Sequence, residues 1–252
     1  MRNVDMQLLE KLITSLKEAV LATGTDKVVL GLSGGIDSAL SATLAVKALG
    51  RENVFPYSLP YKLSSQASKD DARLMADHLG ITLETVDLTP MAEGYSGFAA
   101  LTAHRLGNIL ARLRMLVLFD KSAEKNAVVL GSGNKSEILL GYMTLYGDSA
   151  SAVNPVGELY NTQVFEAARL LGIPEPLITK APSADLRPGQ TDEDDLGYSY
   201  ADLDRFLEVY IGQSADEAEL TAKFGAKMTA DVVTRVKANA YKRNLPTILS
   251  IN

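Results

Sequence analysis

Apolar runs of strand length alternate with helix-length stretches over the first half of the chain, and this alternation most constrains its fold. The strand-like runs are "KVVLGL" (27–32), "NVFPYSL" (53–59), "ITLETVDL" (81–88) and "NAVVLGS" (126–132). Helix-like stretches occupy 36–49, 64–79 and 105–124. This order predicts an α/β fold, an open parallel sheet with helices on both faces. Right-handed crossovers then bring the carboxyl ends of all the strands to one edge.

The sequence after about residue 161 is mostly helical in pattern. One polar segment interrupts it, "KAPSADLRPGQTDEDDLGYSY" (180–200), which is rich in Pro, Gly and acidic residues. We predict a long loop there, of the kind that often closes over a functional site. The first 20 residues carry charges throughout and predict an amphipathic helix, not a signal peptide. The organisation predicted for 1–252 is one domain with a helical C-terminal part.

Composition narrows the classes of partner. The 252 residues have a formal net charge of -6, so there is no global basic field to hold a nucleic acid. No apolar run approaches the roughly 18 residues that a membrane span needs. These features predict a protein of the cytoplasm with neither nucleic acid nor membrane as partner. The chain has no cysteine, which excludes disulfides, thiolate metal sites and cysteine nucleophiles within it.

The segment "GLSGGIDSAL" (31–40) joins the first predicted strand to the helix that follows. Its two adjacent glycines allow a close backbone approach to an anion, and Ser33 and Ser38 can donate hydrogen bonds to it. Asp37 would repel a bare phosphate, so a bridging cation is implied, with Mg²⁺ the most suitable. The alternative is a simple glycine turn whose Ser and Asp cap the helix.

Two known nucleotide-binding patterns are absent. No G-x-x-x-x-G-K-[ST] occurs, so this is not a Walker A loop. "GSGNKS" (131–136) does not complete a dinucleotide fingerprint, because its sixth position is Ser136 and not Gly or Ala. A different mode of nucleotide binding is therefore expected.

A second polar segment follows the fourth predicted strand. Ser132, Lys135 and Glu137 leave that strand at the same sheet edge as Asp37. Two carboxylates that converge from two strand ends form a suitable Mg²⁺ site, which phosphate oxygens can complete. The alternative is a surface loop with Glu137 in the first turn of a helix. Upstream, Arg112 shares one helical face with Arg105 and Asn108, which would otherwise be a solvated basic face.

Together these segments resemble the ammonia-dependent NAD synthetases of the adenine nucleotide α-hydrolase-like group. The similarity runs in family order through "GLSGGIDSA", "GNILARLRM", "GSGNKSEILLGYMTLYGD", "NPVGELYNTQV", "PSADLRPGQTDEDDLGYSY" and "YKRNLP". "SGGxDS" alone is shared with other pyrophosphate-releasing ligases, whereas the later segments are more specific. The resemblance implies a homodimer with deamido-NAD, ATP and ammonia as substrates. ATP would adenylate the nicotinate carboxylate of deamido-NAD, and ammonia would then displace AMP to give NAD.

The resemblance also implies roles for individual residues. Asp37 and Glu137 match the metal ligands and are the predicted catalytic residues. Arg112, and Lys242 beside Tyr241, match contacts to deamido-NAD. The predicted ATP-binding residues are Gly31, Leu32, Ser33, Gly34, Gly35, Ile36, Asp37, Ser38, Ser132, Asn161 and Ser183.

Three positions depart from the family pattern. Asn161 stands where a lysine commonly meets ATP, and we predict that Lys135 supplies the missing charge. Leu145 and Ala152 stand where some members have a Lys and an Asp that touch the dinucleotide. Two other functions remain open from the sequence: another adenylating ligase with "SGGxDS", or a non-catalytic nucleotide-binding homologue.

Overall fold

A four-stranded parallel sheet forms the centre of the protein. The computed structural model describes residues 2–98, 100–180 and 192–244. Within them the strands are β1 (Val28–Gly31), β2 (Val54–Ser58), β3 (Glu84–Thr85) and β4 (Val128–Leu130), in the order β3-β2-β1-β4. Val28 is aligned with Val54 on one side and with Val128 on the other. Every neighbouring pair is parallel, so the strands end at a common edge.

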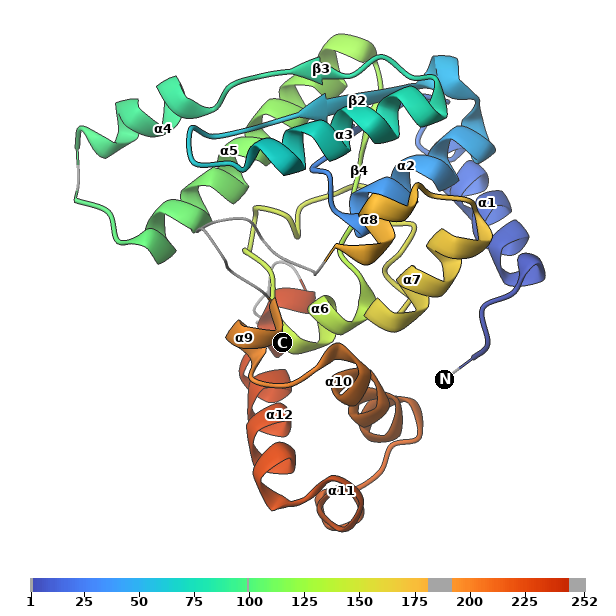
Figure 1. Ribbon diagram of the computed structural model, residues 1–252, viewed down its shortest axis with the longest axis vertical. Coiled ribbons are helices and arrows are strands. Elements are labelled where there is room, and N and C mark those ends of the chain that lie inside the picture. Colours follow the sequence, from blue (N-terminus) through green and yellow to red (C-terminus); the bar gives the residue numbers. More distant parts are fainter. Residues whose placement is uncertain (1, 99, 181–191, 245–252) are drawn as a thin grey trace, which may run out of the picture.

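Helices account for most of the remaining described chain (Figure 1). The α-helices are α1 (Met6–Leu21), α2 (Ile36–Leu49), α3 (Gln66–Leu79), α4 (Thr89–Ser96), α5 (Ala103–Lys125), α6 (Lys135–Leu140), α7 (Asn161–Leu170), α8 (Glu175–Thr179), α9 (Asp192–Leu196), α10 (Tyr200–Leu207), α11 (Glu217–Phe224) and α12 (Ala226–Ala238). Two 3₁₀ turns, η1 (Arg51–Asn53) and η3 (Ala240–Arg243), and one π turn, η2 (Glu208–Gly212), complete the set.

Alternate residues of the strands face different helices. Val28 and Leu30 of β1 belong to a core with α1, α2, α3 and α7, whereas Val29 joins Tyr57 and Val117 of α5 on the opposite face. This period-two alternation is what a pleated strand buried on both sides requires. The predicted α/β fold with helices on both faces is confirmed.

The C-terminal part has its own core, in a helical lobe that lies beyond the strand ends (Figure 1). Phe206 of α10 is fully buried there and packs at a tilt against Phe224 of α11, with ring centroids 5.0 Å apart. Val232 and Val236 of α12 and Leu140 of α6 close the core. The predicted helical C-terminal part is therefore present.

A buried carboxylate joins the lobe to the sheet half. One oxygen of Asp204, on α10, accepts a hydrogen bond from the Thr162 amide (2.8 Å), and the other accepts one from the Ser136 hydroxyl. The Ser136 oxygen in turn accepts a bond from the Asn161 amide (2.9 Å). Asp204 thus satisfies the Thr162 amide in the first turn of α7 directly and supports the acceptor of the Asn161 amide through Ser136, at a helix start where N–H groups lack intrahelical partners.

Two sequence predictions need correction. The run 81–88 forms only the two-residue β3, and α4 follows where we predicted no helix. The predicted loop 180–200 contains α9, in which Asp192 is only 5% exposed, so residues 192–196 are helical and packed. Residues 181–191 of that segment lie outside the described residues. No helix in the described ranges is long and apolar enough to cross a membrane.

Candidate functional site

The loop after β1 is held in shape by its own hydroxyl groups. The Ser33 amide donates to Ser38 Oγ (3.2 Å), Ser38 Oγ donates to the Gly35 carbonyl (2.9 Å), and the Gly35 amide donates to Ser33 Oγ (3.2 Å). Helix α2 starts directly after Gly35 and has no side-chain cap. Its first N–H groups and its positive dipole end therefore face outward beside two hydroxyls, an arrangement suited to an anion. We call residues 31–38 the phosphate loop.

Gly34 is at the tip of this loop, where only glycine fits. Its φ is +81°, and a Cβ atom there would come within 2.2 Å of the Ser68 carbonyl oxygen. The tip is consequently docked on the first turn of α3.

Asn134 brings the two predicted carboxylates together at the sheet edge. Its side-chain Nδ2 donates to Asp37 Oδ1 (3.0 Å), and its backbone amide donates to Glu137 Oε2 (2.9 Å). The Glu137 amide donates back to Asn134 Oδ1 (3.0 Å), which completes a capping box at the start of α6. Asn134 is fully buried and is 97 residues from Asp37 in the chain. No sequence pattern indicated this role for Asn134.

Both carboxyl groups are unfavourably placed for ionisation. Burial raises the pKa of Asp37 to about 6, the charge of Asp192 adds to the rise, and the Asn134 hydrogen bond opposes it. Burial also raises the pKa of Glu137 well above its usual range, with the Asp37 charge next in importance. Asp192 accepts a hydrogen bond from the Tyr142 hydroxyl (3.2 Å). Only its acidic segment "TDEDDL" hinted at this residue in the sequence.

This donor set fits a hard divalent cation. The ligands available are carboxylate oxygens, which Mg²⁺ prefers, and a cation would offset the mutual repulsion of Asp37 and Glu137. In the described part of the chain no three acidic or histidine side chains gather closely enough to hold a metal by themselves. Phosphate oxygens and water would therefore have to complete the coordination.

The remaining predicted ATP-binding residues lie at different depths. Ser132 follows β4 and is partly exposed. Asn161, the first residue of α7, is only 3% exposed, and its Nδ2 has no hydrogen-bond partner among the described residues. Ser183 lies outside the described residues.

Lys135 does not face the phosphate loop. Its ammonium pairs with Glu158 (3.2 Å) and lies 4.9 Å from the centre of the Tyr160 ring. The lysine beside the loop is instead Lys180, whose Nζ is 3.4 Å from the Gly34 carbonyl oxygen. The prediction that Lys135 supplies charge to ATP has no geometric support, because its side chain is engaged elsewhere.

The residues predicted to touch the dinucleotide surround the segment 141–148. Arg112 Nε donates to the Leu145 carbonyl (3.1 Å), and Lys242 Nζ donates to the carbonyls of Gly141 (2.7 Å) and Met143 (3.0 Å). Burial lowers the pKa of Lys242. Tyr241 is 57% exposed.

A cavity of about 190 Å³ opens beside this segment. Its lining includes Glu137, Asp148 and Lys242. One of the two predicted metal ligands and one of the predicted dinucleotide contacts therefore share a wall. Leu145 and Ala152 hold this region through backbone bonds, since the Leu145 carbonyl accepts from Arg112 and the Ala152 amide donates to Val129 (3.0 Å).

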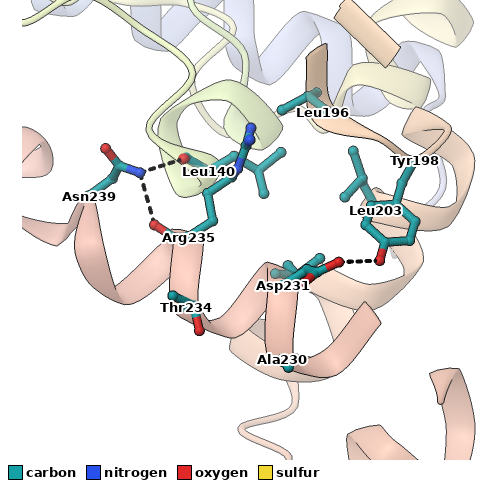
Figure 2. Close-up of a pocket in the computed structure, with 10 residues that line it drawn as sticks. Leu140, Leu196, Tyr198, Leu203, Ala230, Asp231, Thr234, Arg235 and Asn239 are labelled. Carbon is teal, nitrogen blue, oxygen red and sulfur yellow. Dashed lines mark hydrogen bonds between the residues drawn. The ribbon is translucent and has the colours of Figure 1, made fainter. Parts of the chain in front are cut away.

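A larger cavity, of about 570 Å³, lies in the helical lobe (Figure 2). At one end the Tyr198 hydroxyl donates to Asp231 (2.7 Å), and at the other Asn239 Nδ2 donates to the Leu140 carbonyl (3.3 Å). None of the phosphate-loop residues, Asp37 or Glu137 lines it. Cavity volume alone would therefore select the helical lobe as the functional site, and not the sheet edge with Asp37, Glu137 and the phosphate loop.

Comparisons with known proteins point to one family. A family model described as NAD synthase matches residues 8–246. The "NH(3)-dependent NAD(+) synthetase" of Trichlorobacter lovleyi is 45% identical over 99% of this chain and 93% of its own. Among solved structures, "NMN synthetase from Francisella tularensis" superposes with a TM-score of 0.85 at 30% identity, covering 99% of this chain and all of the other. An "NH3-dependent NAD synthetase from Campylobacter jejuni", solved with nitrate, gives 0.83 at 34% identity, covering 98% and 100%.

Proposed function

The chain belongs to the NAD synthase family, and from this membership we infer that it is a ligase that forms NAD from deamido-NAD, ATP and ammonia. The products besides NAD are AMP and pyrophosphate, and an adenylated deamido-NAD is the intermediate. The observation that carries the proposal is the uncapped start of α2 beside the Asp37–Asn134–Glu137 group, in a chain so similar to curated synthetases of this type.

In the first step the nicotinate carboxylate attacks the α-phosphorus of ATP and pyrophosphate leaves. The nucleophile is already ionised, so the step needs no base from the protein. The phosphate loop would hold the departing pyrophosphate through the uncapped backbone N–H groups at the start of α2 and the Ser33 hydroxyl, and through the Ser38 hydroxyl once it turns from the Gly35 carbonyl, which is electrostatic preorganisation. Asp37 and Glu137 would hold Mg²⁺, which when bound neutralises charge on the phosphates.

In the second step neutral ammonia attacks the acyl carbon of the adenylate. A C–N bond forms, the C–O bond to AMP breaks, and one proton leaves the nitrogen. Water would hydrolyse the same intermediate, so the site must exclude it. We assign Arg112, Tyr241 and Lys242 to deamido-NAD. Arg112 and Lys242 both contact segment 141–148, and Lys242 also lines the 190 Å³ cavity.

We also propose the remaining ATP contacts, the domain organisation and the oligomeric state. ATP would contact residues 31–38, Ser132, Asn161 and Ser183, and residues 1–252 would act as one cytoplasmic domain. A homodimer is supported by exposed apolar side chains on α5, the helix of Arg112, where Leu116 is 59% and Phe119 46% exposed. Light scattering on the wild type and on Leu116→Glu tests this assembly, and a monomeric wild type would contradict it.

The central test is pyrophosphate release by the purified protein with Mg-ATP and deamido-NAD, with ammonium or glutamine as nitrogen donor. We expect turnover with ammonium, because the 252 residues contain no cysteine to act as a glutaminase nucleophile. Efficient use of glutamine would contradict the ammonia assignment. Absence of pyrophosphate release with either donor would instead favour another adenylating ligase or a non-catalytic homologue.

A second substrate has a specific observation in its favour. The Francisella tularensis protein whose structure superposes with a TM-score of 0.85 is an NMN synthetase. Deamido-NMN lacks the adenosine phosphate half of deamido-NAD, and would need fewer contacts. Parallel assays with both substrates separate the two. We expect deamido-NAD to be preferred, since curated relatives at 45% identity are NAD synthetases whereas the NMN synthetase is 30% identical.

A further inference from the structure

Lys180, at the end of α8, connects the phosphate loop to α3. Its ammonium donates to Asp71 Oδ2 (2.8 Å), to Ser68 Oγ (3.1 Å) and, at 3.4 Å, to the Gly34 carbonyl. The Lys180 side chain is 32% exposed and that of Asp71 only 17%, so the ion pair is partly shielded from water. Such a pair holds its geometry better than a fully exposed one.

The contact between Lys180 and the Gly34 carbonyl affects the conformation of the phosphate loop. In a planar peptide the C=O of one residue and the N–H of the next point in opposite directions. When Lys180 attracts the Gly34 carbonyl toward α3, the Gly35 N–H is turned the other way, into the loop. There it donates to Ser33 Oγ (3.2 Å), which lies 3.1 Å from Ser38 Oγ. The Lys180 ammonium thus helps to fix the positions of the Ser33 and Ser38 hydroxyls.

We propose that Lys180, held by Asp71, is a positioning residue that fixes the Gly34–Gly35 peptide of the phosphate loop for triphosphate binding. The proposal rests on the ATP-binding role proposed above for residues 31–38. Lys180 acts here through the loop and not by contact with ATP. Asp71 is therefore part of the device, because without it the ammonium is no longer kept on the Gly34 carbonyl.

This dependence on Asp71 gives the test. The variants are Lys180→Met, Asp71→Asn and the double variant. Lys62→Met is the control for loss of a lysine ion pair away from the loop, since Lys62 pairs with Glu93 (2.7 Å) on α4. Calorimetry would measure the Kd of Mg-α,β-methylene ATP, which cannot release pyrophosphate, and steady-state assays would give KM for ATP and for deamido-NAD. Thermal unfolding would report any general loss of stability.

We expect Lys180→Met and Asp71→Asn each to raise the Kd of the analogue about ten-fold, with the double variant no worse than the weaker-binding single variant. Lys180→Arg should recover part of the lost affinity for the analogue. KM for deamido-NAD should stay within about two-fold of the wild-type value in every variant, and so should the Kd of the analogue in the Lys62→Met control. A rise in Lys180→Met alone would mean that Lys180 meets the nucleotide directly and would overturn the proposal. So would a lower Tm with unchanged Kd.

The wild type separates this inference from the proposed reaction. Analogue binding without pyrophosphate release from ATP and deamido-NAD would reject the reaction, and the Kd values of the variants would still decide the role of Lys180. If the wild type does not bind the analogue, both proposals are wrong.

Discussion

The helices α2 and α6 both begin where a parallel strand ends, yet their first turns are built in opposite ways. α2 starts after Gly35 with no side-chain cap, so its N–H groups are left for an external anion. α6 starts with a complete capping box, in which Asn134 and Glu137 satisfy each other's amides. The two starts are joined by the bond from Asn134 to Asp37.

The difference shows how one sheet edge can provide a site for an anion and a site for a cation. The open start of α2 suits phosphate, whereas the closed start of α6 presents one carboxylate of fixed orientation, Glu137, that suits a cation. Asp37, in the first turn of α2, is the carboxylate that belongs to both. If this comparison is correct, a substitution in the loop before α2 should weaken nucleotide binding, whereas substitutions at the start of α6 should lower pyrophosphate release.

Removal of the carboxylate charge should have the largest effect. We expect Asp37→Asn and Glu137→Gln each to lower pyrophosphate release by at least about 100-fold, since neither amide can replace an anionic ligand. Glutamine still serves in a capping box, so far-UV circular dichroism should stay unchanged. Near wild-type activity with Mg²⁺ in either variant would place the cation elsewhere. The start of α6 would then have no role in binding a cation.

Gly34→Ala should weaken nucleotide binding and stability together. Positive φ costs alanine about 1–2 kcal/mol, and the clash with the Ser68 carbonyl adds to this cost. Gly24→Ala is the control, because Gly24 has φ +90° but no atom within 4 Å of the added Cβ. We expect Gly24→Ala to lose stability without loss of ATP affinity, measured by denaturation and calorimetry. Equal losses in both would show that docking on α3 is irrelevant.

Asn134 can be used to separate the cap from the bridge. Asn134→Ala should lose about 1 kcal/mol of stability with the cap. Asn134→Ser keeps a capping side chain that is too short to reach Asp37. We expect Asn134→Ser to retain most stability, and its pyrophosphate release to fall about ten-fold, as for a residue that orients metal ligands. Full activity in Asn134→Ser would mean that the link between α2 and α6 has no functional role.

Lys135→Ala should have the smallest effect. Its partner Glu158 is 85% exposed, and such surface pairs contribute about 0–1 kcal/mol. KM for ATP should change by less than about two-fold. A large rise would restore the idea that Lys135 supplies the charge absent at Asn161.

The sequence predicted the parts of the fold that depend on local pattern. β1, β2 and β4 fall within the predicted runs, and α2 has the predicted bounds of 36–49, because strand and helix periodicities are properties of neighbouring residues. β3 was predicted too long, since only Glu84 and Thr85 pair in register with β2, and beyond them the contact is reduced to the bond from the Val86 amide to the Ser58 carbonyl (3.0 Å). α4 was missed because Gly94 weakens its helical pattern.

The site was predicted less completely, for a physical reason. Asp37 and Glu137 could be placed by their positions at strand ends. Asn134, Asp192 and Lys180 act through partners distant in the chain, such as the contact of Lys180 with Gly34, 146 residues away. No periodicity records such contacts. The ion pair of Lys135 with Glu158, 23 residues further along the chain, was missed for the same reason.

Helix α6 has only six residues, yet it belongs to both halves of the molecule. Glu137 faces the sheet edge from its first turn, and Leu140, three residues later, is buried in the lobe core. Each residue of an α-helix turns the chain by about 100°, so one inserted or deleted residue between these two would rotate the lobe anchor away from its core or the carboxylate away from Asp37. Length variation in related chains should therefore accumulate in the surface loops and be absent between 134 and 140. An engineered insertion there should disable the protein more thoroughly than any substitution in the same turn.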